Sequence, residues 1–294
     1  MLWQIFSVIN ASINATANVI DKYVLSKWVK NPLNSALILG IIQVVVSIII
    51  FMVVGFKTIS LMNLFLALIS GMCYMLMTIF YFKSVQMDEV SRVAPLFSLT
   101  PILVLIFAFI FLNEFFTYWR YAGIFVIIIG AILLSYKPKT KMFFGKAFGV
   151  MLLAVFFLAI SNVITKYLLN FYDYWTVFAY TRIGVIFIII PLCYYSYKDL
   201  KLIISRHGFK AIFFISISEL FILLGAFAGI LALSLGPVTL VSAFSSIQNF
   251  ILLFITFILS ILFPHIIKEK IDKNTFFLKI IAITLMLIGI ILIS

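Results

Sequence analysis

Ten runs of apolar residues, each about as long as a membrane span, restrict the fold of this 294-residue chain more than any other feature. A helix needs roughly 20 apolar residues to cross the hydrocarbon core of a bilayer. Backbone that faces lipid must satisfy its hydrogen bonds internally, so each run is expected to be a helix. The runs cover residues 2–22, 35–55, 60–82, 90–113, 119–136, 146–169, 175–197, 210–234, 238–263 and 276–294. We therefore predict an all-α polytopic membrane protein with ten transmembrane helices.

The charged residues favour a lipid bilayer as a partner and argue against nucleic acid. They make up 10% of the chain, against 65% apolar residues, whereas a soluble domain carries about 25% charged residues. The net charge is +12, but the cations form short runs between the apolar segments instead of one polar face. Cations in such places orient membrane proteins, so we expect a multi-pass protein of the cell membrane.

One segment occurs twice, about half a chain length apart. Residues 18–25 read NVIDKYVL and residues 162–169 read NVITKYLL, with six identical positions. Two further pairs of similar segments follow in the same order, residues 93–101 with 241–249 and residues 120–135 with 279–294. Three matches in one order indicate an internal duplication. We assign residues 1–140 to the first five-helix repeat and residues 141–294 to the second.

An odd number of spans in each repeat means that the second repeat crosses the membrane in the opposite direction to the first. Inverted repeats are common in transporters, whose substrate sites lie near the bilayer midplane between the repeats. We therefore expect one transport unit with a central cavity between its two halves.

Asparagine recurs at every fourth residue of the first span, at Asn10, Asn14 and Asn18. This spacing places all three amides on one helical face. Two interpretations stay open: the stripe lines a wet cavity, or it joins neighbouring helices through hydrogen bonds worth about 0.6 kcal/mol each.

Two ionisable residues lie deep within spans, Arg182 in the seventh and Glu219 in the eighth. A charge at this depth costs at least ~2.5–3.5 kcal/mol, so each residue should face the protein interior and have a partner. They could form an ion pair that joins two helices. Alternatively, Arg182 binds a substrate carboxylate or phosphate through its planar fork, and Glu219 holds a substrate amine or a coupled proton.

Further candidates are Gln43, a lone polar residue at mid-depth in the second span, and the aromatic residues Tyr74, Tyr81, Trp175 and Tyr180. Aromatic rings can hold an ammonium group, although packing or an interfacial belt explains most such rings equally well. The predicted substrate-binding residues are Asn14, Asn18, Gln43, Tyr74, Tyr180, Arg182 and Glu219, with Glu219 as the coupling candidate.

Motifs for nucleotide, metal or enzymatic chemistry are missing from the sequence. There is no GxxxxGK[ST] loop, and the two histidines, His207 and His265, do not have zinc-ligand spacing. We expect no cofactor, no metal and no enzymatic activity.

Small residues recur seven apart in the fifth and tenth spans, as Gly123 with Gly130 and Ala282 with Gly289. Each pair forms a strip that permits close helix packing. We expect these strips away from the substrate cavity, where the two spans meet each other or a second protomer, which leaves a homodimer open.

Several motifs resemble the drug/metabolite transporter superfamily, in its EamA-type branch. The resemblance is carried by residues 91–101 (SRVAPLFSLTP), 112–114 (LNE), 121–123 (YAG) and 130–135 (GAILLS), and more loosely by 235–238 (LGPV) and 245–248 (SSIQ). It implies a transporter of small solutes, and it implies that Glu114, in the Leu-x-Glu ending, is a structural cap. Pro101 should kink the fourth span, whereas Asn249 at the corresponding position predicts no such kink in the ninth.

We therefore predict a secondary transporter, an exporter, of small polar or zwitterionic metabolites such as amino acids. It would work by alternating access at the central cavity. The alternative is a flippase or accessory subunit for a lipid-linked intermediate, because relatives of this fold serve lipid modification.

The distribution of Lys and Arg also predicts the orientation. Links one–two, three–four, five–six, seven–eight and nine–ten lie on one side and carry 17 of the 21 Lys and Arg residues, whereas the opposite links carry three. Short cationic loops remain in the cytoplasm. We predict that both termini face outward.

Overall fold

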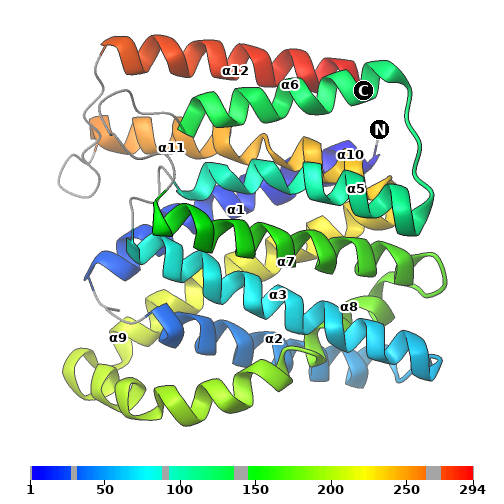
Figure 1. Ribbon diagram of the computed structural model, residues 1–294. Helices are drawn as coiled ribbons and strands as arrows, with labels where there is room; N and C mark the ends of the chain where they lie inside the picture. Colours follow the sequence, from blue (N-terminus) through cyan, green and yellow to red (C-terminus); the bar gives the residue numbers. More distant parts are fainter. Residues whose placement is uncertain (1, 28–31, 88–92, 136–144, 263–272, 294) are drawn as a thin grey trace.

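The computed structural model describes residues 2–27, 32–87, 93–135, 145–262 and 273–293 (Figure 1). These ranges contain helices and no strand. The helices are α1 (Leu2–Lys27), α2 (Pro32–Val54), α3 (Leu61–Met87), the 3-10 helix η1 (Ala94–Leu99), α5 (Thr100–Leu112), α6 (Tyr118–Ser135), α7 (Lys146–Leu169), α8 (Tyr174–Ile183), α9 (Ile186–Leu235), α10 (Val238–Ser245), α11 (Gln248–Leu262) and α12 (Lys273–Ile293). The prediction of an all-α polytopic membrane protein is confirmed.

Six helical segments are long and apolar enough to cross a bilayer by themselves. They are Leu33–Val54, Leu61–Met87, Lys146–Leu169, Tyr174–Ser196, Ser216–Leu235 and Val238–Thr256. Shorter apolar helices lie at Leu96–Leu112, Tyr118–Gly130 and Ile280–Ile293. The helix α1 has the length of a span, but its asparagine stripe makes it less apolar. The total of ten spans therefore stays a prediction.

The seventh and eighth spans are built differently from the expectation. α8 ends at Ile183, and α9 then continues for 50 residues through the rest of span seven and all of span eight. Figure 1 shows α9 turning back on itself at the left of the view. At the break between α8 and α9, Gly184 lies so close to α3 that an added Cβ would come within 2.3 Å of the Leu68 carbonyl oxygen. Close backbone contact thus accompanies a break that the sequence did not suggest.

The fourth and ninth spans are both interrupted. In the fourth, η1 changes into α5 at Thr100, and Pro101 lies in the first turn of α5. In the ninth, α10 ends at Ser245 and α11 begins at Gln248. The expectation of an uninterrupted ninth span is wrong, because the amides of Ser246 and Ile247 bond three residues back, to the carbonyls of Ala243 and Phe244. A tight turn therefore interrupts the helix without a proline.

The helix contacts pair up between the two halves of the chain. α3 packs along α7 and α1 along α9, while α5 contacts α7 and α1 contacts α11. Each of these contacts joins one span of the first half to one span of the second. When the two halves are exchanged, span three against span six becomes span eight against span one, and span four against span six becomes span nine against span one. These pairings are compatible with the duplication. The two repeats and their inversion nevertheless stay predictions.

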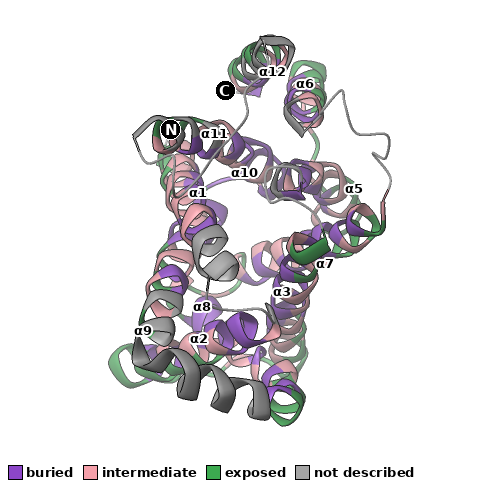
Figure 2. Ribbon diagram, turned by 90° about the vertical axis from the view of Figure 1, so that its left-hand side faces the viewer, coloured by how far each residue is buried: buried purple, intermediate pink, exposed green. Residues whose placement is uncertain are grey.

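α6 and α12 pack along each other at one edge of the molecule (Figures 1 and 2), and α6 also contacts η1, α5 and α10. An added Cβ on Gly123 would lie 2.8 Å from the Gly289 carbonyl oxygen, and one on Gly130 would lie 2.8 Å from the Ala282 carbonyl oxygen. The small-residue strips therefore meet each other across this pair, and the prediction that the fifth and tenth spans pack through them is confirmed.

The two chain termini lie at the same end of the molecule in Figure 1. Many of the cations used to predict orientation, such as Lys30, Arg92 and Lys270, lie outside the described residues. Which end faces the cytoplasm stays a prediction.

Candidate functional site

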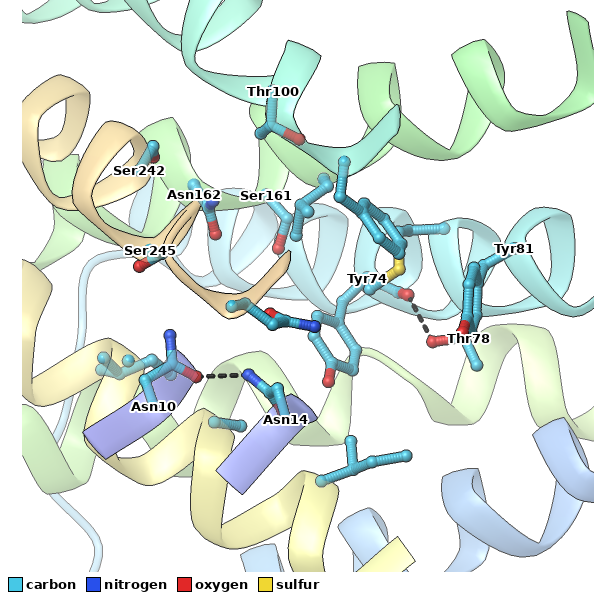
Figure 3. Close-up of a pocket in the computed structure, with 18 of the residues that line it drawn as sticks. Asn10, Asn14, Tyr74, Thr78, Tyr81, Thr100, Ser161, Asn162, Ser242 and Ser245 are labelled. Carbon is cyan, nitrogen blue, oxygen red and sulfur yellow. Dashed lines mark hydrogen bonds between the residues drawn. The ribbon is translucent and has the colours of Figure 1, made fainter. Parts of the chain in front are cut away.

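A cavity of about 220 Å³ lies between the two halves of the chain. Its lining comes from α1, α2, α3, η1 and α5 of the first half and from α7 to α11 of the second. Much of the lining is polar: Asn10, Asn14, Asn18, Tyr74, Thr78, Tyr81, Ser98, Thr100, Ser161, Asn162, Thr165, Arg182, Ser242, Ser245, Ser246, Gln248 and Asn249. Figure 3 shows side chains from both halves turned toward this space.

The asparagine stripe of α1 forms part of this lining, and it also packs on α9. Asn14 donates a hydrogen bond to Asn10, as the dashed line in Figure 3 marks. Glycines make room for the two amides: an added Cβ would come within 2.5 Å of Asn14 at Gly225 and 3.0 Å of Asn10 at Gly229. The asparagine stripe thus packs against two glycines of α9 and also lines the cavity. Both interpretations of the asparagines hold in part.

Asn18 connects the stripe to α3. Its Oδ1 accepts a hydrogen bond from the hydroxyl of Tyr81 at 3.3 Å, and its buried Nδ2 has no hydrogen-bond partner. A buried amide donor without a partner is expected where water or a ligand binds.

Arg182 is the one charged residue of the cavity lining within the described part of the chain. It is 4% exposed. Its Nη1 donates a hydrogen bond to Oε1 of Gln43 at 3.1 Å, and its guanidinium carbon lies 4.2 Å from the ring centroid of Tyr74. The buried Nε of Arg182 has no hydrogen-bond partner. The guanidinium is therefore held from two sides and keeps a free donor.

Three predicted site residues lie outside the cavity lining. Gln43 on α2 is buried and acts through Arg182. The hydroxyl of Tyr180 donates to the carbonyl oxygen of Lys57 at 2.9 Å, so Tyr180 belongs to one end of the molecule and not to the cavity. Glu219 on α9 is 1% exposed and interacts electrostatically with Tyr74. Within the part of the chain that the structure describes, Arg182 contacts Gln43, Tyr74 and Phe178, and the ion pair considered with Glu219 is not seen.

Apart from Arg182, sequence reasoning missed the polar second-half side chains of the lining. Ser161, Asn162 and Thr165 on α7 face the cavity, and Ser70 of α3 lies 3.0 Å from Thr165, oxygen to oxygen. Asn162 is the repeat counterpart of Asn18, so the duplicated segment contained a signal that would have found it.

The interruptions of spans four and nine meet at the cavity. Asn249, beside the break of the ninth span, donates a hydrogen bond to the hydroxyl of Ser98 in η1. Three hydroxyl oxygens near the two breaks, those of Thr100, Ser242 and Ser246, are buried and have no hydrogen-bond partner. Irregular backbone within a membrane protein is tolerated where it lines a cavity.

Polar contacts join the two halves at the end of the molecule where both termini lie (Figure 1). Lys57 and Asp173 form a salt bridge of 2.7 Å. Glu114 accepts hydrogen bonds from the backbone amide of Val238 at 2.9 Å and from the hydroxyl of Thr239 at 2.9 Å. Glu114 therefore does cap a helix, but it caps α10 of the other half, where a carboxylate also favours the positive end of the helix dipole.

Lys166 binds the end of α9 at the same end of the molecule. Its ammonium group donates to the carbonyl oxygens of Leu233 and Gly236, both at 2.8 Å, where α9 ends. An ammonium group satisfies the last carbonyls of a helix and interacts favourably with its dipole. The link between α9 and α10 is thus fixed by a cation on one side and an anion on the other.

The model of the EamA-like transporter family matches residues 1–136. A crystal structure described only as that of a protein has a similar fold, with a TM-score of 0.64 and 13% sequence identity over 99% of this chain and 97% of the other. At this identity the likeness concerns the fold alone. No curated protein was found to match the sequence.

Proposed function

We propose that this chain, whose residues 1–136 match the model of the EamA-like transporter family, exports small polar metabolites by secondary transport. The proposed substrates are amino acids and similar solutes, and the proposed location is the cell membrane. The observation that carries the proposal is the cavity lined by both halves of the chain, with Arg182 in its wall.

The size and chemistry of the cavity support a small solute. Its volume of about 220 Å³ is below the range of about 300–1,000 Å³ that is usual for drug-sized ligands. Amide, hydroxyl and guanidinium groups supply hydrogen bonds throughout the lining. This volume favours a small metabolite over the lipid-linked intermediate, whose chain would not be enclosed.

Alternating access requires the contacts at the terminal end to open. The salt bridge between Lys57 and Asp173 joins the halves there, as do the bonds from Val238 and Thr239 to Glu114. A solute that leaves the cavity toward this end must pass between the two halves, where these contacts hold them together. In the proposed cycle they form and break once per turnover, while Arg182 and the asparagine stripe hold the solute.

Flux through purified protein in liposomes tests the proposal. We expect preloaded liposomes to accumulate labelled solute by exchange when the internal and external solutes match. The solutes to be tried are amino acids, polyamines, choline and phosphorylated metabolites, preceded by a thermal-shift screen, because a ligand that binds only the folded state raises its stability. Failure of every solute to exchange, with protein that melts cooperatively, would contradict transport.

A further inference from the structure

We infer that the site takes a small organic anion and discriminates against a free ammonium group. This inference rests on the proposed transport of small polar solutes and, within that class, favours small organic anions over amino acids. It comes from the charges of the lining and from the buried polar atoms that lack partners, considered together.

The lining is positively charged in the described part of the structure. It contains Arg182 and no Asp, Glu, Lys or His. Glu219, the acid expected to hold a substrate amine, lies outside the lining. In the lining that the structure describes, a zwitterion would therefore meet a partner for its carboxylate and no carboxylate for its ammonium.

Arg182 is prepared for an anion rather than neutralised by the protein. Gln43 is neutral, so its hydrogen bond orients the guanidinium without cancelling the charge. The ring of Tyr74, 4.2 Å from the guanidinium carbon, does the same from a second side. A buried cation is costly until an opposite charge reaches it, and the partnerless Nε is a donor that an oxyanion can use.

The remaining partnerless atoms also suit an acceptor-rich ligand. They are Nδ2 of Asn18 and the hydroxyls of Thr100, Ser242 and Ser246. An amide nitrogen can only donate, and a hydroxyl can donate to an oxyanion. Their residues lie on α1, α5, α10 and the break before α11, and all four line the cavity, from both halves of the chain. Such buried groups without partners are rare unless a ligand or water completes them.

Solutes with one carbon skeleton and different charges test the inference. The probes are glycerate, glycerol phosphate, serine, serinol and glycerol, with binding to the purified protein measured by calorimetry. We expect glycerate or glycerol phosphate to bind about tenfold or more tightly than serine and serinol, because serine and serinol bring an ammonium group that must leave water without a carboxylate to pair with it. The two anions distinguish a carboxylate from a phosphate ligand.

Variants of Arg182 connect the preference to the site. Arg182→Gln should remove the advantage of the anions, and Arg182→Lys, which keeps the charge but loses the fork, should retain part of it. Ser246→Ala should weaken anion binding several-fold. The matched control is Arg120→Gln on α6, outside the cavity lining, which should bind all probes like the unchanged protein.

Two results would overturn the inference. One is binding of serine or serinol as tightly as glycerate, which leaves transport intact and removes only the anion preference. The other is a cooperatively melting protein that binds none of the five probes. Exchange in liposomes is measured separately, so loss of the proposed function is recognised by absent flux and not by the order of affinities.

Discussion

Glu219 is a buried acid in the part of α9 that forms span eight. It is 1% exposed and interacts electrostatically with Tyr74. If it carries the coupled proton, Glu219→Gln should abolish the dependence of flux on a proton gradient while the protein keeps its melting behaviour. Flux into liposomes measured with and without a pH difference checks this. Asp199→Asn, which removes an acid of the same helix between the two predicted spans, is the control. A pH dependence that survives in Glu219→Gln would remove Glu219 from the coupling role.

Asp173 offers a second test at the scale of one residue. Partial burial raises the pKa of Asp173, but hydrogen bonds from Lys57 and Thr176 outweigh it and hold that pKa below its ordinary value. A depressed folded pKa means that the ionised group stabilises the protein above the unfolded pKa, about 3.9 for Asp, and that this contribution is lost as the pH falls through the folded value.

The melting temperature of the unchanged protein should therefore exceed that of Asp173→Asn by a constant amount around neutral pH. This difference in melting temperature should shrink below about pH 4. Asparagine keeps an acceptor for the cap of α8, so the comparison isolates the charge. A difference that stays the same into the acid range would show that the charge of Asp173 contributes nothing.

At the scale of the element, the contact between α6 and α12 depends on small residues. Gly130→Leu would push a side chain into backbone that an added Cβ already approaches to 2.8 Å, and overpacking of this kind costs about 1–3 kcal/mol. We expect a lower melting temperature or yield and an almost unchanged ligand affinity, because the pair lies apart from the cavity.

Gly149→Leu on α7 is the matched control, since an added Cβ there meets nothing within 4 Å. Normal stability of Gly130→Leu together with lost affinity would contradict the assignment and place the strip at the site. The strip was predictable because seven residues make nearly two helical turns, so a repeated small residue marks one face.

At the scale of the whole molecule, orientation is the sharpest prediction. The imbalance of 17 to three Lys and Arg residues predicts that both termini face outward. A C-terminal phosphatase fusion should be active, and a C-terminal fluorescent protein that matures only in the cytoplasm should stay dark. The reverse pattern would show that the charge count is misleading or that the number of spans is odd. The contacts around Glu114 and Lys166 would then close the inner side.

The sequence by itself determined the helical membrane class, most span positions, the asparagine stripe and the strips that join α6 to α12. These features follow from composition and from the helical period, which are local properties of the chain. Asn162 could also have been predicted, because it has the same position in the second copy of the duplicated segment as Asn18 has in the first.

Only the tertiary structure decided which polar groups share a cavity. Arg182 and Glu219 looked alike in sequence, yet one lines the cavity and the other does not, because a helix rotation decides which way a side chain points. The packing of the ninth-span break against η1 and the contacts of Glu114 with α10 likewise join segments more than a hundred residues apart. Such contacts leave little trace in the sequence, since their geometry is fixed when the helices pack.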